Sequence, residues 1–141
     1  MKKSLDKFGK LVIENMRDKQ IDFVNSLFEN KWKSEELVEL QNKLSEFDAK
    51  EQLIIKQMVE ILLTNTMHDF LFALQDSHDS EEKLDIIVDQ KELICLSDGL
   101  HGEIFGDEGW IVRFSKFKSE IEIERSNFAK EFIKKLFGNK N

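Results

Sequence analysis

Four residues between positions 68 and 101 are of types that could hold a metal and do chemistry: His68, Asp69, Asp98 and His101. Imidazole nitrogen and carboxylate oxygen both bind divalent cations, and a water bound to such a cation becomes a nucleophile. The four residues are therefore the candidate catalytic set of a metal-dependent hydrolase. However, only three histidines occur in the 141 residues, and adjacent residues on a helix point about 100° apart. The alternative interpretation is that His68 makes a structural hydrogen bond inside the protein.

A second set of candidate residues comes from the charge pattern. The net charge is −7, and residues 66–110 alone contain twelve acidic and two basic side chains. An acidic surface repels phosphate backbones, which argues against nucleic-acid binding, and it favours a basic protein partner. The candidate binding residues are Asp76, Asp79, Glu81, Glu82, Asp107 and Glu108, with Trp110 as an aromatic anchor. The alternative is that these charges form an ordinary solvated surface.

Other residues with reactive side chains carry weaker signals. His78 also precedes an aspartate, but the pattern places it in a loop. Cys95 lies in the apolar run 93–96, where a free cysteine is usually a small buried hydrophobe. The glycines and acids of residues 98–109 could bind a cation, but tight turns are the favoured interpretation.

Length and composition predict one soluble domain over residues 1–141. The chain is 40% hydrophobic and contains no proline, and a chain of this length can bury a sizeable core. No apolar run is long enough to predict a membrane helix. Asp6, Lys7 and Lys10 interrupt the region where a signal peptide would be apolar. A single cysteine forms no internal disulfide, which favours a reducing, cytoplasmic location; the oligomeric state stays open.

Helices in the first half of the chain must position these residues. Apolar side chains spaced by three and four predict helices over residues 4–29, 34–47 and 48–76. Asp48 and Glu51 have the spacing of a capping box at the start of the third helix. From Met58 onward that helix is apolar on nearly all sides, which predicts that it forms the buried centre of the domain.

After residue 80 the apolar period changes from helical to two. The expected strands lie within residues 84–89, 93–96, 103–105 and 110–114, with a turn at Gln90-Lys91. The spacing of apolar side chains in residues 118–137 predicts a closing amphipathic helix that ends at Gly138. The predicted fold class is α+β, with three N-terminal helices, a small antiparallel β-meander of three to four strands, and a C-terminal helix.

Three runs resemble a family of small bacterial proteins known only as a domain of unknown function. The runs are residues 68–75 (HDFLFALQ), 96–106 (LSDGLHGEIFG) and 109–111 (GWI). The resemblance implies a small bacterial cytoplasmic protein and carries over no catalytic residue. In size and acidity such domains are similar to the immunity proteins that neutralise bacterial toxins, and this second step is an analogy alone.

The favoured hypothesis is a non-enzymatic protein-binding domain of the immunity-protein-like or regulatory kind, without metal or cofactor. Its partner would be a basic protein, and neither nucleic acid nor membrane is expected. The alternative hypothesis is the metal-dependent hydrolase that uses His68, Asp69, His101 and Asp98. Three histidines and no recognisable catalytic motif favour the first hypothesis.

Overall fold

The chain begins with a long helix whose middle is wound as a π-helix. In this computed structural model, which describes residues 2–81 and 84–117, the helix consists of α1 (Lys2–Val12), η1 (Ile13–Asp18) and α2 (Lys19–Phe28). The sequence predicts one helix over about the same residues. The position of that helix is confirmed, but the π-helical segment in its middle was not predicted. Wider turns of this kind often lie at functional or strained positions, and here the π segment places two charged side chains, Arg17 and Asp18, in the interior.

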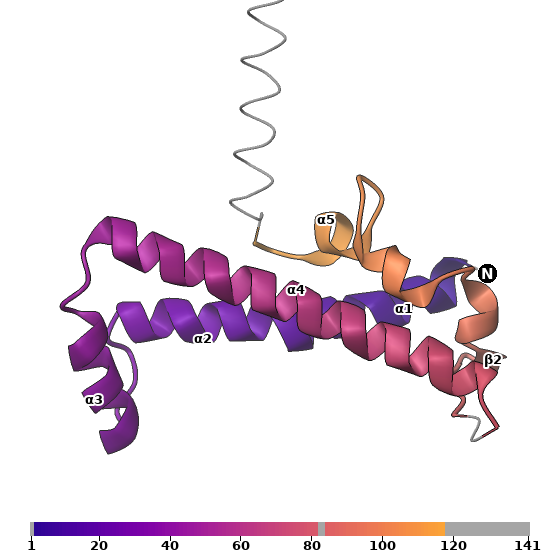
Figure 1. Ribbon diagram of the computed structural model, residues 1–141, viewed down its shortest axis with the longest axis horizontal. Helices are drawn as coiled ribbons and strands as arrows, with labels where there is room; N and C mark the ends of the chain where they lie inside the picture. Colours follow the sequence, from indigo (N-terminus) through magenta and orange to yellow (C-terminus); the bar gives the residue numbers. More distant parts are fainter. Residues whose placement is uncertain (1, 82–83, 118–141) are drawn as a thin grey trace, which may run out of the picture.

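Two further helices follow. α3 (Glu35–Leu44) begins after Ser34, and α4 (Ala49–Asp79) begins after Asp48. The predicted capping box is confirmed, because the Asp48 carboxylate accepts from the Glu51 amide while the Glu51 carboxylate accepts from the Asp48 amide. Figure 1 shows α4 running back along η1 and α2, while α3 packs against α2 at the far end of the molecule.

The long helix α4 is buried on one side only. Met67, Leu71 and Leu74 are its buried residues and share one face at intervals of four and three. Met58 and Ile61, by contrast, are exposed. The prediction that this helix is enclosed on all sides is therefore wrong in the described structure, because η1, α2 and the segment after the hairpin cover just one of its faces.

A small hairpin is the β structure of the described residues. β1 (Ile87–Val88) pairs antiparallel with β2 (Lys91–Glu92). The turn is Asp89-Gln90, where both residues have positive φ, rather than the expected Gln90-Lys91. Two residues with positive φ are the geometry of a tight hairpin turn.

The other expected strands are short helices. The segments are η2 (Ile94–Leu96) and η3 (Leu100–Ile104), both 3₁₀-helices, and the α-helix α5 (Trp110–Phe114). The predicted meander of three to four strands is thus corrected to a mostly helical fold with one two-stranded sheet. Short apolar runs of four or five residues fit a buried strand and a buried helical turn equally well, and here the core selects the helical turn.

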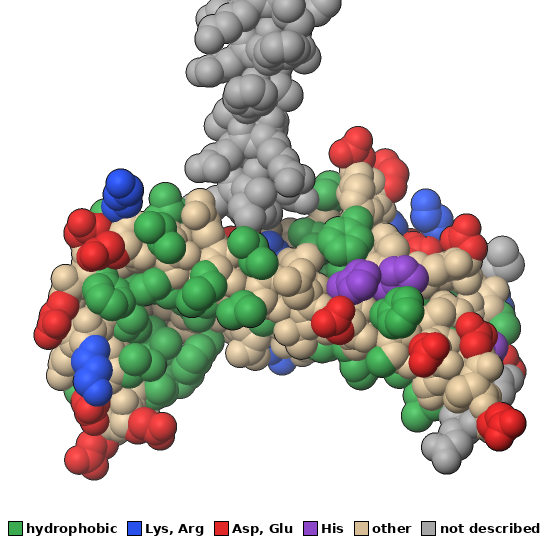
Figure 2. Space-filling model, in the orientation of Figure 1, with side chains coloured by type: hydrophobic (Ala, Val, Ile, Leu, Met, Phe, Trp, Pro, Cys, Tyr) green, Lys and Arg blue, Asp and Glu red, His purple; other side chains and the backbone are tan. Residues whose placement is uncertain are grey.

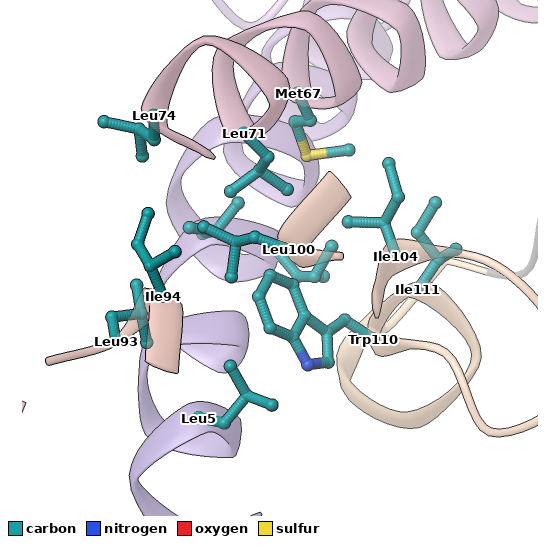
Figure 3. Close-up of a cluster of buried hydrophobic side chains, with 12 residues drawn as sticks. Leu5, Met67, Leu71, Leu74, Leu93, Ile94, Leu100, Ile104, Trp110 and Ile111 are labelled. Carbon is teal, nitrogen blue, oxygen red and sulfur yellow. The ribbon is translucent and has the colours of Figure 1, made fainter. Parts of the chain in front are cut away.

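These short elements complete the hydrophobic core with α1, η1 and the second half of α4 (Figure 3). The buried residues are Leu5, Val12, Ile13, Met67, Leu71, Leu74, Leu93, Ile94, Leu100, Ile104, Trp110 and Ile111. Trp110 is the largest of them and is 0% exposed. The core therefore lies at one end of the molecule, around η3 and α5, and the end that carries α3 contributes no residue to it.

The expected closing helix over residues 118–137 lies outside the described residues. Within residues 2–81 and 84–117, no helix is both long enough and apolar enough to cross a membrane.

Candidate functional site

Two of the predicted catalytic residues lie side by side. His68 on α4 and His101 on η3 have ring centroids 5.2 Å apart with planes inclined by 83°. Phe72 stacks near His68 with centroids 6.4 Å apart and meets His101 edge-on at 5.3 Å. Phe105 adds a third contact, with its centroid 6.0 Å from that of His68. The packing of η3 on α4 thus creates a histidine–phenylalanine cluster. The sequence hypothesis grouped its two histidines but not its two phenylalanines.

This cluster is aromatic rather than metal-binding in its geometry. His68 Nδ1 lies 3.0 Å from Asp69 Oδ1, so the Asp69 carboxylate forms a hydrogen bond with the preceding residue in the chain. Within the described part of the chain, His68, Asp69, Asp98 and His101 do not bring three ligand atoms within 4.8 Å of one another. The structure therefore brings the two histidines together, but it does not bring all four residues together. The contact between His68 and His101 supports the hydrolase hypothesis, whereas the described residues form no metal centre from this set.

The predicted acidic binding residues are solvent-exposed but spread over the surface. Asp76 and Asp79 are exposed in the last turns of α4, and Asp107 and Glu108 are exposed in the tight turn before α5. Glu81 is also exposed, and Glu82 lies outside the described residues. Figure 2 shows acidic side chains at both ends of the visible face and between them. These charges can steer a basic partner over some distance, but they do not outline one binding patch.

Trp110 is not an interface residue, which corrects its prediction as the aromatic anchor. Its side chain is fully buried and meets the Phe8 ring edge-on, with centroids 6.0 Å apart. A partner could contact it only after α5 left the core. The second tryptophan, Trp32, is 39% exposed and packs against Phe23 instead.

A third candidate feature is apolar, and among the described residues it lies over α3 and the first half of α4. We name it the α3–α4 apolar surface and define it by eight exposed side chains: Val38, Leu40, Phe47, Leu53, Ile54, Met58, Ile61 and Leu62. Each is between 36% and 56% exposed. Figure 2 shows hydrophobic side chains gathered over this end of the molecule. Single exposed apolar residues are ordinary, whereas a gathered set marks an interaction surface.

Helix geometry explains how α4 can carry this surface and still pack on the core. At 100° per residue, Ile54, Met58 and Leu62 fall on one side of the helix, and Met67 and Leu71 fall on the opposite side. One apolar face meets the core, and the other meets solvent. The sequence shows that both faces are apolar, but only the tertiary structure shows which of them is covered.

Acidic residues border the α3–α4 apolar surface. Glu35, Glu36 and Glu39 on α3 are exposed, as are Glu46 and Glu51 around the start of α4. Residues 34–65 contain seven acidic and three basic side chains in all. An apolar area with an acidic border is complementary to an apolar area with a basic border.

An open pocket of about 360 Å³ lies elsewhere, between η1, α2 and the segment after α5. Its lining residues are Glu14, Asp18, Lys19, Asp22, Phe114 and Lys116. The charged groups pair with each other: Lys116 forms an ion pair with Asp22, and its backbone amide donates to Asp18 at 2.8 Å. Because these groups are already engaged, the pocket does not present the convergent polar groups that fix a small ligand.

No protein-family model, no curated protein and no solved structure matches this chain. The family resemblance of residues 68–75 and 96–111 stays a prediction. The function must therefore be argued from the surfaces themselves.

Proposed function

We propose that this protein is a non-enzymatic protein-binding domain and that it binds a basic partner through the α3–α4 apolar surface. The observation that carries the proposal is the set of eight large apolar side chains exposed on neighbouring elements. Soluble proteins rarely leave so many of them uncovered in one place without a use for them. The acidic border supplies the charge preference.

Energetics favours this surface over the predicted acidic patch as the source of affinity. Fully burying one Leu, Ile or Met side chain stabilises a complex by about 1.5–3 kcal/mol, whereas one exposed ion pair contributes about 0.2–1 kcal/mol. Covering Ile54, Met58 and Leu62 alone would therefore outweigh several surface charge pairs. A helix with one apolar face and lysine or arginine on its flanks has the matching chemistry.

The predicted acidic residues keep a role in this proposal as steering charges. Asp76, Asp79, Asp107 and Glu108 are exposed and carry no ion pair with a described lysine or arginine. Replacing these four with lysine should slow association and flatten its dependence on salt, because long-range attraction acts on the encounter rate. Unchanged association would remove them from the proposal without affecting the apolar surface.

The class of protein follows as part of the same proposal. A small, acidic, cytoplasmic binding domain of the immunity-protein-like or regulatory kind would need an exposed docking surface and no catalytic centre. Cys95 forms no disulfide, which agrees with a reducing compartment. The hydrolase alternative rests on the proximity of His68 and His101 alone.

The test uses a synthetic amphipathic helical peptide of leucine and lysine as the probe for a basic apolar partner. The variant is Ile54→Gln with Leu62→Gln, and the matched control is Leu11→Gln with Val112→Gln, which are equally exposed apolar residues outside the surface. We expect the first variant to bind the peptide at least about tenfold more weakly, which corresponds to about 1.4 kcal/mol. We expect the control to bind as the parent does.

Two results would overturn the proposal. Equal loss of binding in both variants would mean that the peptide adheres to any exposed apolar residue. A parent dimer that Ile54→Gln with Leu62→Gln converts to a monomer, measured by sedimentation, would show that a second copy of the chain covers the surface instead of a basic partner.

A further inference from the structure

Three potential metal ligands meet where the end of α4 contacts the hairpin. His78 lies in the last turn of α4, Glu92 is the last residue of β2, and Cys95 lies in η2. One ligand atom from each of the three lies within 4.8 Å of the others. Among the described residues this is the single group of three or more such side chains that approach so closely. Neither the proposed binding surface nor the histidine–phenylalanine cluster uses any of them.

The imidazole of His78 is oriented as in a metal site. Its Nδ1 atom lies 3.1 Å from Asp79 Oδ1, so the carboxylate can hold the ring proton on that nitrogen. Its Nε2 atom is buried, has no hydrogen-bond partner among the described residues, and lies near the carboxylates of Asp85 and Glu92. A histidine that donates one ring N–H to a carboxylate and directs the other nitrogen at a cation is the usual arrangement of a metal-bound histidine.

The spacing of the ligand atoms fits a tetrahedral ion. Nitrogen, oxygen and sulfur ligands at zinc distances of about 2.0–2.3 Å are separated from one another by about 3.3–3.8 Å when they form a tetrahedron. His78 Nε2 lies 3.6 Å from Asp85 Oδ1 and 3.8 Å from Glu92 Oε2. Cys95 Sγ lies 3.4 Å from Glu92 Oε2. These three distances lie in the range that a tetrahedral ion requires, and Asp85 lies beside the group of three, close to His78.

The donor set selects the kind of metal. Calcium and magnesium prefer oxygen ligands alone, whereas a set of one imidazole, one thiolate and carboxylates suits zinc or a similar transition metal. The net negative charge of residues 66–110 also favours the arrival of a cation.

We propose that His78, Glu92 and Cys95 bind a zinc ion that fastens the end of α4 to the β1–β2 hairpin and η2. Binding converts the Cys95 thiol to a thiolate and releases its proton to solvent.

A bound ion would stabilise the contact between α4 and the hairpin, which the hairpin alone holds weakly. The hairpin pairs two residues with two, and two-stranded hairpins are marginally stable on their own. Leu93 and Ile94, which directly follow the hairpin, are core residues. An ion held between α4 and the hairpin would therefore fix the position of part of the core, including the segment that leads to His101.

The experiment titrates the full chain, first reduced and treated with chelator, with Co²⁺ as a spectroscopic probe and then with Zn²⁺ in competition. We expect one equivalent of Co²⁺ to bind with a sulfur-to-cobalt charge-transfer band and tetrahedral visible bands, and Zn²⁺ to displace it. Saturating Zn²⁺ should raise the Tm by several degrees, because a ligand of the native state stabilises it.

Variants separate this site from the other histidines. Cys95→Ser, a substitution at an exposed position, should abolish the charge-transfer band and weaken Co²⁺ binding at least about tenfold. His78→Gln should do the same without removing the thiol. His68→Gln is the matched control and should leave the spectrum and the affinity unchanged.

Three outcomes would overturn the proposal. They are no charge-transfer band in the parent, a band that persists in His78→Gln with unchanged affinity, and loss of the band in His68→Gln. In the first case the cluster would be a set of hydrogen bonds and close polar contacts around His78 without a metal ion. None of these outcomes bears on the α3–α4 apolar surface, which contains none of these residues.

Discussion

Gly9 and Trp110 are packed so closely that no side chain can stand at position 9. A Cβ atom on Gly9 would lie 2.3 Å from Cε2, 2.4 Å from Cδ2 and 2.6 Å from Nε1 of the indole. The face of α1 that Gly9 leaves open is thus filled by the largest buried side chain of the protein. Glycine weakens a helix interior by about 1 kcal/mol relative to alanine, and here that weakness permits the close approach of the two elements.

Replacing Gly9 with alanine should therefore destabilise the protein although alanine is the better helix former. The gain in helix propensity is about 1 kcal/mol, but the new methyl group overlaps three ring atoms, and overpacking of this kind costs about 1–3 kcal/mol or more. We expect a net loss of about 1–2 kcal/mol in the free energy of unfolding, measured by urea titration. Gly102→Ala is the control, because a Cβ there meets nothing within 4 Å. Equal stability of Gly9→Ala and the parent would contradict the packing.

Local signals predicted the helices well because each of them is complete within a few residues. The Asp48–Glu51 capping box and the apolar spacing after it place the start of α4 within one residue. Ser34 marks the start of α3 in the same way, although its side chain makes no capping hydrogen bond. Such signals are independent of the rest of the fold, so a sequence shows them directly.

Features that depend on distant contacts could not be predicted in this way. The runs at 93–96, 103–105 and 110–114 have the apolar content of strands, but their partner is the face of α1 and α4 rather than another strand. For the same reason Trp110 is a core residue and not an anchor. Which apolar face of α4 is covered also depends on elements far away in the chain.

The candidate metal ligands were missed because their local assignments were wrong. His78 was expected in a loop and lies in the last turn of α4, and Cys95 was expected in the core and is exposed. Their nearness depends on how the hairpin folds back onto α4. His68 and His101 were predicted as members of one set, but the aromatic character of their contact arises from Phe72 and Phe105. The sequence placed Phe72 in a buried helix and Phe105 in a short strand.

A buried ion network joins the π-helix to α4 and to the end of α5. Arg17 is 1% exposed and contacts Asp18 at 3.3 Å, Glu60 at 3.5 Å and Ser115 Oγ at 2.6 Å. Removing one partner of a buried ion pair leaves the others uncompensated, which costs about 3–5 kcal/mol. We expect Arg17→Leu to lower the free energy of unfolding by about that amount, or to prevent folding.

The neighbouring Lys19 supplies the control for this prediction, because it is exposed and its ammonium donates to Asn15 one helix turn away. Lys19→Leu should change the urea midpoint by a small fraction of the Arg17→Leu effect. A variant that also replaces Glu60 with leucine should recover part of the loss, because it removes a carboxylate that has lost its contact with the Arg17 guanidinium. A midpoint for Arg17→Leu that equals that of Lys19→Leu would show that the network is not stabilising.

The ion pair between Asp6 on α1 and Arg113 on α5 predicts how stability depends on pH. Arg113 donates two hydrogen bonds to the Asp6 carboxylate, at 2.8 Å and 2.6 Å. These bonds, and then the charges of Arg113 and Lys2, lower the pKa of Asp6 below its ordinary value of 3.8. A carboxyl group whose pKa is lower in the folded state stabilises the protein above its unfolded pKa, and this stability is lost as the pH falls toward the folded pKa.

We therefore expect the parent to lose stability below about pH 4 more steeply than Asp6→Asn does. The two proteins should differ by about 1 kcal/mol at pH 7, because the pair is partly solvated, and converge near pH 2. Urea titrations across this range measure the difference. Arg113→Gln and the double variant complete a thermodynamic cycle; additive single effects at pH 7 would show that the two residues are not coupled.

The connection between α2 and α3 is held by one buried amide. Gln41 on α3 is 3% exposed; its Oε1 accepts from the Trp32 amide at 2.9 Å, and its Nε2 donates to the Trp32 carbonyl at 3.1 Å. The Gln41 side chain thus pairs with the Trp32 backbone as a neighbouring strand would. It fixes the connector between α2 and α3, and the connector in turn positions α3 and its part of the apolar surface. Removing both hydrogen bonds should cost about 1–2 kcal/mol and free the connector locally.

We expect Gln41→Ala to increase hydrogen exchange at the Trp32 amide at least about tenfold, measured by NMR, while exchange in the Trp110 region stays unchanged. Asn42→Ala, an exposed neighbour on the same helix, should leave Trp32 exchange as it is in the parent. Gln41→Glu distinguishes the two bonds, since it keeps the acceptor for the Trp32 amide but directs a carboxylate at the Trp32 carbonyl. Hydrogen exchange at the Trp32 amide should be at least as fast in Gln41→Glu as in Gln41→Ala. A buried carboxylate that faces the Trp32 carbonyl disrupts the connector more than a missing side chain does. If Gln41→Ala exchanges as slowly as the parent, the position of α3 is set by its packing on α2 and not by this amide.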